Sequence, residues 1–123
     1  MLEDYKKHCK EREEMGIPPL PLSAEQTADV VNLLKKEHQE NELLLHLLKE
    51  RVPAGVDDAA YVKAGFLSDL TKGETESPYI SKEDAVAILG TMLGGYNIQP
   101  LIDCLEIEGL ADDAAVALSN TLL

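Results

Sequence analysis

The 123-residue sequence contains few aromatic residues and few cysteines. It has no tryptophan, four tyrosines, two cysteines and a single phenylalanine, Phe66. Cys9 and Cys104 lie far apart and form no Cys-x-x-Cys pair, so the sequence signals neither a disulfide framework nor a metal or cluster site, and we expect two free thiols. The apolar residues are mostly Leu, Ala, Val and Ile, and no stretch sustains the alternation of a strand. An aliphatic, all-helical core is therefore expected.

Long apolar runs are also absent. No stretch approaches the roughly 18 apolar residues that a membrane span requires. The first residues, from Met1 to Met15, carry too many charges for a secretory signal. Together with the free thiols, this pattern predicts a cytoplasmic protein that does not enter a membrane.

Basic residues are scarce, and none follows Lys82. The chain has 11 basic and 23 acidic residues, giving a formal net charge of −12, which repels nucleic acid and anionic membrane surfaces. This charge disfavours a nonspecific nucleic-acid binder. Any RNA contact would have to involve the first helix or the region of Lys49, Arg51 and Lys63.

No catalytic constellation is present in the sequence. It contains no Gly-x-Ser-x-Gly or His-Glu-x-x-His motif, and neither cysteine has a candidate base nearby in the chain. His38, Glu42 and His46 follow at helical i, i+4 steps and would share a face for a metal if one helix ran through them. A polar break near Asn41 is expected to interrupt that helix. We therefore assign no catalytic, cofactor-binding or metal-binding residue.

Helical periodicity and capping residues predict about seven short helices. Ser23 with Gln26 and Ser81 with Asp84 form capping boxes, and Asp57 can cap a further helix. The expected helices cover residues 2–15, 24–36, 42–51, 58–72, a segment from 82 to about 93, a segment from 98 that ends by 109, and the region from about 111 onward.

Several of these helices carry apolar residues on two sides, as helices in stacked layers do. Leu44, Leu47 and Leu48 form one face of residues 42–51, and Leu43 broadens it. Antiparallel pairs stacked as an α-solenoid fit this pattern, and a compact irregular bundle is the alternative. No exact sequence repeat separates the two.

A proline-rich connector follows the first helix. Gly16 ends that helix, and the segment from Ile17 to Leu22 contains three prolines, which fix an extended, stiff backbone. The favoured interpretation is that Leu20 and Leu22 pin the connector to the core. A ligand for an aromatic groove is the functional alternative.

The most unusual stretch, residues 90–103, predicts a tight helical corner. Gly94 and Gly95 can adopt the positive φ that ends a helix, Asn97 can cap the next helix, and Pro100 would lie in its first turn. Met92 and Leu93 are expected to close an apolar face on the incoming helix. The residues expected to form a buried stripe on the outgoing helix are Ile98, Leu101, Ile102 and Leu105.

Gly90 and Gly94 are one helical turn apart, which favours close helix packing. The alternative is a phosphate-cradling loop. That loop would need a preceding strand and a following Lys-Ser or Lys-Thr, and the sequence has neither.

Two long segments of this chain resemble a known family. The segments from Arg51 to Leu67 and from Leu89 to Ile98, with Lys72-Gly-Glu74, Ser77-Pro78 and Pro100-Leu-Ile102 in the same order, are similar to the N-terminal domain of bacterial aconitase B. The resemblance extends over essentially the whole chain and is weakest around residues 36–42. It implies a HEAT-like α-α superhelix, in agreement with the solenoid derived from the helix pattern.

The resemblance also implies a function for the whole enzyme that this chain does not carry by itself. In that family the full enzyme interconverts citrate and isocitrate through cis-aconitate, using a [4Fe-4S] cluster held by three cysteines of later domains. Neither Cys9 nor Cys104 matches a cluster position. The family assigns to this domain protein–protein contact, including self-association, and a part in access to the active site; it links RNA binding to the full-length enzyme.

We therefore expect residues 1–123 to form one HEAT-like, non-catalytic interaction domain. The last expected helix ends in apolar Leu122 and Leu123 without a cap, which suggests the N-terminal part of a longer protein. A free-standing helical adaptor and an RNA-contacting module are the alternatives. The candidate contact residues are Arg51, Tyr61, Gly94, Gly95, Tyr96 and Asn97.

Overall fold

The computed structural model describes residues 1–122 and the side chains of residues 1–121. Over these residues it contains seven α-helices and no strand. Their bounds are α1 (Leu2–Glu14), α2 (Ala24–Leu34), α3 (Asn41–Glu50), α4 (Asp58–Lys72), α5 (Lys82–Gly90), α6 (Ile98–Cys104) and α7 (Ala111–Leu122). The all-α prediction is confirmed, and the apolar ending expected at Leu122 and Leu123 lies outside the described side chains.

The predicted helix starts are formed by the predicted caps. Ser23 and Gln26 make a complete capping box at α2, and Ser81 and Asp84 make another at α5. The Asp57 carboxylate accepts the Ala59 amide at 2.9 Å and begins α4. These caps satisfy backbone N–H groups that have no partner within the helix, which is why short polar motifs locate helix starts well.

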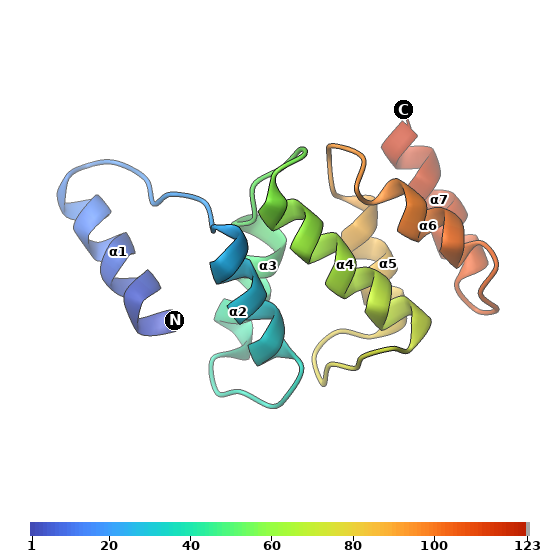
Figure 1. Ribbon diagram of the computed structural model, residues 1–123, viewed down its shortest axis with the longest axis horizontal. Helices are drawn as coiled ribbons and strands as arrows, with labels where there is room; N and C mark the ends of the chain where they lie inside the picture. Colours follow the sequence, from blue (N-terminus) through green and yellow to red (C-terminus); the bar gives the residue numbers. More distant parts are fainter. Residues whose placement is uncertain (123) are drawn as a thin grey trace.

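Helices α2 to α7 form two layers of antiparallel neighbours (Figure 1). In that view α2, α4 and α6 lie in front and α3, α5 and α7 lie behind. Each front helix packs on the helix that follows it in the chain, and α2–α4 and α5–α7 are the main contacts between successive pairs. This stacked pairing is the arrangement expected of an α-solenoid.

The core between the layers is aliphatic, as the composition predicts. Leucines supply most of the fully buried side chains, and Phe66, the one phenylalanine, is also buried. The largest side chains that are almost fully buried from solvent are those of Leu22, Leu34, Leu44, Leu47, Leu48, Leu67, Leu89, Leu101 and Leu110. No helix of residues 1–122 combines the length and the apolar character that crossing a membrane requires.

Helix α1 stands at one end of the molecule and contacts the body less closely than the other helices contact one another (Figure 1). Leu2 and Tyr5 are its buried residues. Met15, which directly follows α1, is exposed. Among the described helices, none packs on the side of α1 that faces away from the body (Figure 1).

The connector is attached to the body by one of the two leucines expected to hold it. Leu22 is fully buried, and its amide donates to the Arg51 carbonyl at 2.9 Å. Leu20 is 54% exposed, so the prediction that it packs on the core is wrong. Its backbone amide instead donates to His8 Nε2 at 3.0 Å, which holds the connector without burying the side chain.

The helical corner forms, but it begins earlier than predicted. Helix α5 ends at Gly90, and Leu93 is 70% exposed instead of closing an apolar face. Pro100 lies in the first turn of α6, as expected. Of the expected buried stripe Leu101 is buried, whereas Ile102 and Leu105 are exposed because no further helix of the described chain packs beyond α6.

Glycines allow two close backbone approaches in this region. Gly94 has φ +101°, and a Cβ placed on it would lie 2.3 Å from the Cα and carbonyl oxygen of Gly55. A Cβ on Gly90 would lie 2.9 Å from that of Ala117, so the close packing of α5 against α7 is confirmed. Gly94 itself lies beyond the end of α5 and contributes to a loop contact, not to a helix face.

Candidate functional site

A shallow groove between α4 and α6 brings together three of the predicted contact residues. On α4 its lining residues follow at helical spacing, so they form one stripe of that helix. The cavity has a volume of about 320 Å³, and its lining consists of Tyr61, Ala64, Gly65 and Ser68 from α4 and Gly95, Tyr96, Gln99 and Pro100 from the start of α6. We call it the tyrosine groove.

The two tyrosines form one wall of this groove. Their rings pack edge to face, with centroids 5.4 Å apart and planes at 77°. The Tyr96 hydroxyl donates to the Val56 carbonyl at 3.2 Å, whereas Tyr61 is 64% exposed. Tyr96 is half-buried against the core and supports the exposed Tyr61 ring. An exposed tyrosine held in this way offers a rigid apolar surface with a hydroxyl group at its edge, and tyrosine is enriched in protein interfaces.

The floor of the tyrosine groove is low because Gly65 has no side chain. A Cβ at this position would meet no atom within 4 Å, so the glycine faces open space. On the opposite rim, Gln99 donates to Asp103 at 2.9 Å, and Lys72 lies 3.3 Å from the same carboxylate. The Gln99 hydrogen bond, and to a lesser extent the Lys72 ammonium, lower the pKa of Asp103. The carboxylate beside Gln99 is therefore already paired with two side chains.

Asn97 is not a contact residue, and its predicted capping role is wrong. It occupies the N-cap position of α6, but its side chain makes no bond to that helix. It is fully buried, and its Nδ2 donates to the carbonyls of Leu89 at 2.8 Å and Met92 at 3.2 Å. The amide therefore closes the carboxyl end of α5, where carbonyl groups lack partners.

Arg51 also lies away from the tyrosine groove and fixes the connector. Its Nη2 donates to the Pro19 carbonyl at 2.7 Å. Burial raises the pKa of Tyr5, a hydrogen bond with Cys9 raises it further, and Arg51 opposes both effects. The guanidinium thus lies between the connector and Tyr5 of α1.

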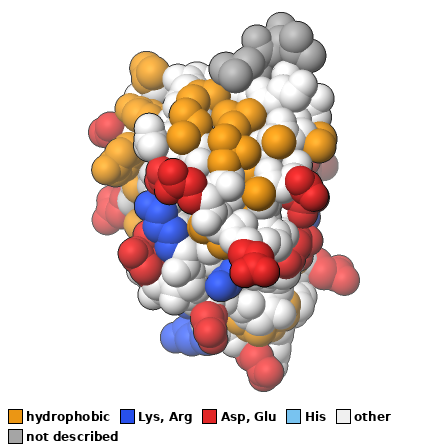
Figure 2. Space-filling view, turned by 90° about the vertical axis from the view of Figure 1, so that its right-hand side faces the viewer, with side chains coloured by type: hydrophobic (Ala, Val, Ile, Leu, Met, Phe, Trp, Pro, Cys, Tyr) orange, Lys and Arg blue, Asp and Glu red, His pale blue; other side chains and the backbone are white. Residues whose placement is uncertain are grey.

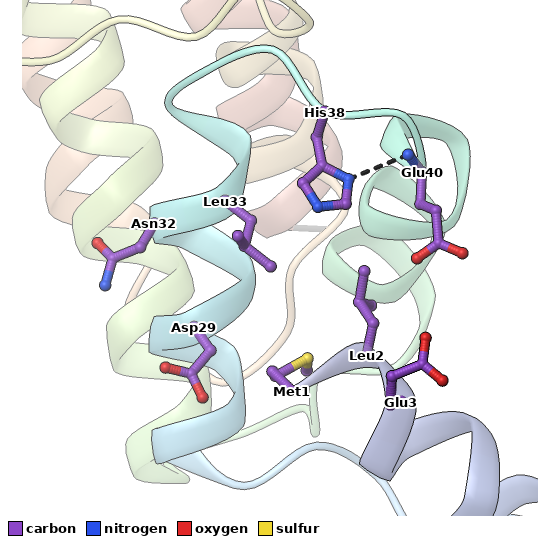
Figure 3. Close-up of a pocket in the computed structure, with 8 residues that line it drawn as sticks. All are labelled: Met1, Leu2, Glu3, Asp29, Asn32, Leu33, His38 and Glu40. Carbon is purple, nitrogen blue, oxygen red and sulfur yellow. Dashed lines mark hydrogen bonds between the residues drawn. The ribbon is translucent and has the colours of Figure 1, made fainter.

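The largest cavity, of about 580 Å³, lies between the start of α1, helix α2 and the turn before α3 (Figure 3). Its polar side chains include Glu3, Asp29, Glu40 and His38. The Glu40 amide donates to His38 Nδ1 at 3.0 Å, and Lys6 pairs with the Glu40 carboxylate. These bonds hold the turn and tie α1 to it.

The sequence pattern of His38, Glu42 and His46 does not lie on a single helix. Helix α3 begins at Asn41, so the predicted break is confirmed and His38 lies in the preceding turn. Within residues 1–122, no three His, Cys, Asp or Glu side chains converge as ligands of one metal ion. Only two cysteines occur in the sequence, Cys104 is buried on α6 and Cys9 lies on α1, so these residues do not fit a cluster held by three cysteines.

Lys63 is a buried charge that the sequence did not single out as such. It is 5% exposed, lines a small cavity of about 130 Å³, and its ammonium donates to the Lys49 carbonyl at 3.4 Å. Burial lowers its pKa to about 8, against a smaller opposing effect of Glu50. Because Lys49 lies in the last turn of α3, the ammonium satisfies a helix end, where a positive charge is favourable.

A second groove, of about 400 Å³, is lined by residues of α5 and α7 beside the contact between these helices. Figure 2 shows hydrophobic side chains gathered on the end of the molecule formed by α6 and α7, with acidic side chains at their margins. Val116, which lines the groove, is 62% exposed. Its rim carries Glu83 and Asp113, so this surface is both apolar and acidic.

These observations define a class of protein: a stacked-helix domain with a tyrosine-lined groove on its surface. The sequence comparisons give the family. The chain matches the family described as the aconitate B N-terminal domain over residues 4–123, and it belongs to that family.

The relatives come from distant bacterial groups. The chain is 58% identical over 124 residues to aconitate hydratase B of Escherichia coli (strain K12), covering 100% of this chain and 14% of that protein. It is 53% identical over 126 residues to aconitate hydratase B of Synechocystis, with 100% and 14% covered. For aconitate hydratase B of Helicobacter pylori (strain J99) the identity is 49% over 124 residues, with 99% and 15% covered. The chain thus spans about a seventh of the length of these relatives.

Proposed function

We propose that this chain is a non-catalytic protein-contact domain of an aconitase B and that the tyrosine groove is its contact surface, including contact with a second copy. The observation that carries this proposal is the exposed Tyr61, packed on the half-buried Tyr96, in a groove that the open position of Gly65 also lines. Rigid aromatic side chains beside a shallow groove are characteristic of the central residues of protein interfaces. Polar side chains such as Gln99 at the margin suit the rim of such an interface.

The whole polypeptide is proposed to act as an aconitate hydratase in the cytoplasm, as the names of its relatives and the resemblance suggest. In that proposal the [4Fe-4S] cluster and the catalytic residues belong to regions beyond residues 1–123. The chain's own contribution is a surface for contact. A free-standing adaptor is the alternative, and sequencing the gene beyond the codon for Leu123 decides between a continuing reading frame and a stop.

Contact with RNA is disfavoured for this domain alone. The net charge of −12 opposes approach of a polyanion, and Lys63, one of the few basic candidates, is buried. A mobility-shift titration of the chain with RNA at rising salt concentration tests this alternative. RNA affinity at physiological salt that falls steeply as salt rises would support phosphate contacts and contradict our assignment.

Sedimentation equilibrium of the purified chain over a wide concentration range tests the proposed contact surface. We expect a concentration-dependent dimer that Tyr61→Ala weakens by at least tenfold in association constant. The matched control is Val116→Ala, which removes an equally exposed apolar side chain from α7. A dimer that responds to Val116→Ala and not to Tyr61→Ala would contradict the tyrosine groove as the contact surface.

A further inference from the structure

We propose that the tyrosine groove of one copy binds the proline-rich connector, residues 17–22, of a second copy. This inference rests on the proposed function, because it names the partner segment for the same groove. It joins two features that the chain itself supplies: an exposed aromatic surface and an exposed segment of the kind that such surfaces bind.

The connector presents apolar groups to solvent in an extended form. Ile17, Pro18, Leu20 and Pro21 are all exposed. Prolines favour the polyproline II conformation, which has three residues per turn, so Ile17 and Leu20 fall on one edge of the segment. Leu20, at 54% exposure, is an apolar side chain without a place in the core of its own molecule.

Hydrogen bonds hold the connector in place before any partner binds. Arg12 Nε donates to the Pro18 carbonyl at 3.0 Å, and the Arg51 guanidinium donates to the Pro19 carbonyl. The Leu20 amide donates to His8 Nε2. A segment that is already ordered loses little conformational entropy on binding, which favours association even through a small contact.

The dimensions of the groove match one turn of such a segment. Its α4 stripe runs from Tyr61 to Ser68, seven residues, which corresponds to about 10 Å of helix at roughly 1.5 Å per residue. Three residues of polyproline II rise about 9 Å. The groove therefore accommodates a Pro-Leu-Pro turn, with the Leu20 side chain above Gly65 and the proline rings beside the two tyrosines.

Within one molecule the connector does not occupy the groove. It runs from α1 to α2 (Figure 1), where Leu20 and Pro21 line a cavity with Tyr5, His8 and Asp57, and no connector residue lines the tyrosine groove. A second copy must therefore provide the partner. Two copies related by a twofold axis exchange both connectors, so the contact occurs twice and closes as a dimer instead of extending as a filament.

The distribution of charge favours this pairing over contact between two C-terminal halves. After Lys82 the chain has seven acidic residues and no Lys or Arg, so two such surfaces repel each other. The connector itself is uncharged, and its neighbour Arg12 is basic. The N-terminal end of a second copy is thus the part that can approach the groove with the least electrostatic cost.

Complementation between two variants of the full chain tests the inference. Leu20→Asp damages the connector and Tyr61→Ala damages the groove, so each variant alone should lose at least tenfold in dimer association constant by sedimentation equilibrium. An equimolar mixture retains one intact connector and one intact groove in each heterodimer. We expect the mixture to associate more tightly than either variant alone, and Val116→Ala to behave like the unchanged chain.

A synthetic peptide with the sequence of residues 16–23 provides a second readout. It should shift the backbone amide resonances of Gly65 and Gly95 in the ¹⁵N-labelled chain and compete with dimer formation, and Tyr61→Ala should abolish the shift. The connector inference is overturned if Tyr61→Ala weakens the dimer but neither Leu20→Asp nor the peptide changes its association constant. The proposed contact surface would remain in place in that case. A chain that stays monomeric at millimolar concentration overturns both.

Discussion

Replacing Gly94 by alanine should destabilise the domain strongly, because two penalties act at one position. The first is conformational: φ is +101°, and a residue with a Cβ held at positive φ costs about 1–3 kcal/mol. The second is steric, since the new Cβ would lie 2.3 Å from the Cα of Gly55. Ordinary contact begins at 3.4 Å, so the two loops must separate by roughly 1 Å.

That separation also affects the hydrogen bond between the same loops. The Gly55 amide donates to the Leu93 carbonyl at 3.3 Å, a distance that leaves no room for stretching, and its loss costs about 1 kcal/mol. The expected total for Gly94→Ala is about 3–5 kcal/mol in the free energy of unfolding. This is a large part of the roughly 5–15 kcal/mol of a whole domain.

Gly95→Ala is the matched control. Gly95 has φ +100°, almost the same as Gly94, but a Cβ there would meet nothing within 4 Å. Urea unfolding followed by far-UV circular dichroism measures both variants, and the difference between them isolates the contact with Gly55. Equal loss of stability in the two variants would show that the glycine contact contributes nothing and would refute this reasoning.

Three further perturbations give distinct signatures. Asn97→Ala should lower the free energy of unfolding in urea by about 2–3 kcal/mol, because it removes two buried hydrogen bonds to the end of α5. Asn97→Asp should be no more stable, since a carboxylate cannot donate these hydrogen bonds. Gly90→Ala should lower the midpoint of thermal unfolding, because the new Cβ would lie 2.9 Å from the Cβ of Ala117. Adding Ala117→Gly should recover part of the loss by relieving that contact. A double variant no more stable than Gly90→Ala would contradict the packing explanation. Lys63 has a pKa of about 8 in the fold and 10.5 when unfolded, so the unfolded chain binds more protons between these values and stability rises with pH. The free energy of unfolding of the unchanged chain, minus that of Lys63→Met, should therefore increase from pH 8 to pH 10. A difference that does not change with pH would contradict a buried lysine that loses its proton in this range.

Local sequence signals predicted the helices well because their chemistry is local. The serine and aspartate caps of α2, α4 and α5 use backbone groups within three residues, so no tertiary information is needed to place them. The predicted segment 58–72 coincides with α4. Helix ends were less accurate: α5 was expected to continue to Leu93, but the loop contact between Gly94 and Gly55, distant in sequence, fixes the chain after Gly90.

The candidate residues were predicted mainly because they lie where the backbone takes an unusual conformation. That signal does not distinguish residues that contact a partner from residues that pack within the domain. Tyr61, Gly95 and Tyr96 do meet at one groove. Asn97 and Arg51 lie outside that groove, and each donates to carbonyl groups from another part of the chain. The open position at Gly65 was missed, although a glycine within an otherwise regular helix was the available signal.

The loose attachment of α1 has a consequence for the motions of the molecule. Leu2 and Tyr5 are its buried anchors, and cavities of about 580 and 480 Å³ lie on either side of the contact. Release of α1 therefore exposes little apolar surface and leaves the pairs from α2 to α7 folded, which makes it a low-energy partial opening. Such an opening also moves the Arg12 and His8 side chains of α1, which hold the connector, away from the body. The fraction of molecules with α1 released then sets the fraction whose connector is held ready for binding. Heating should therefore weaken association by releasing α1 at temperatures below those that unfold the domain.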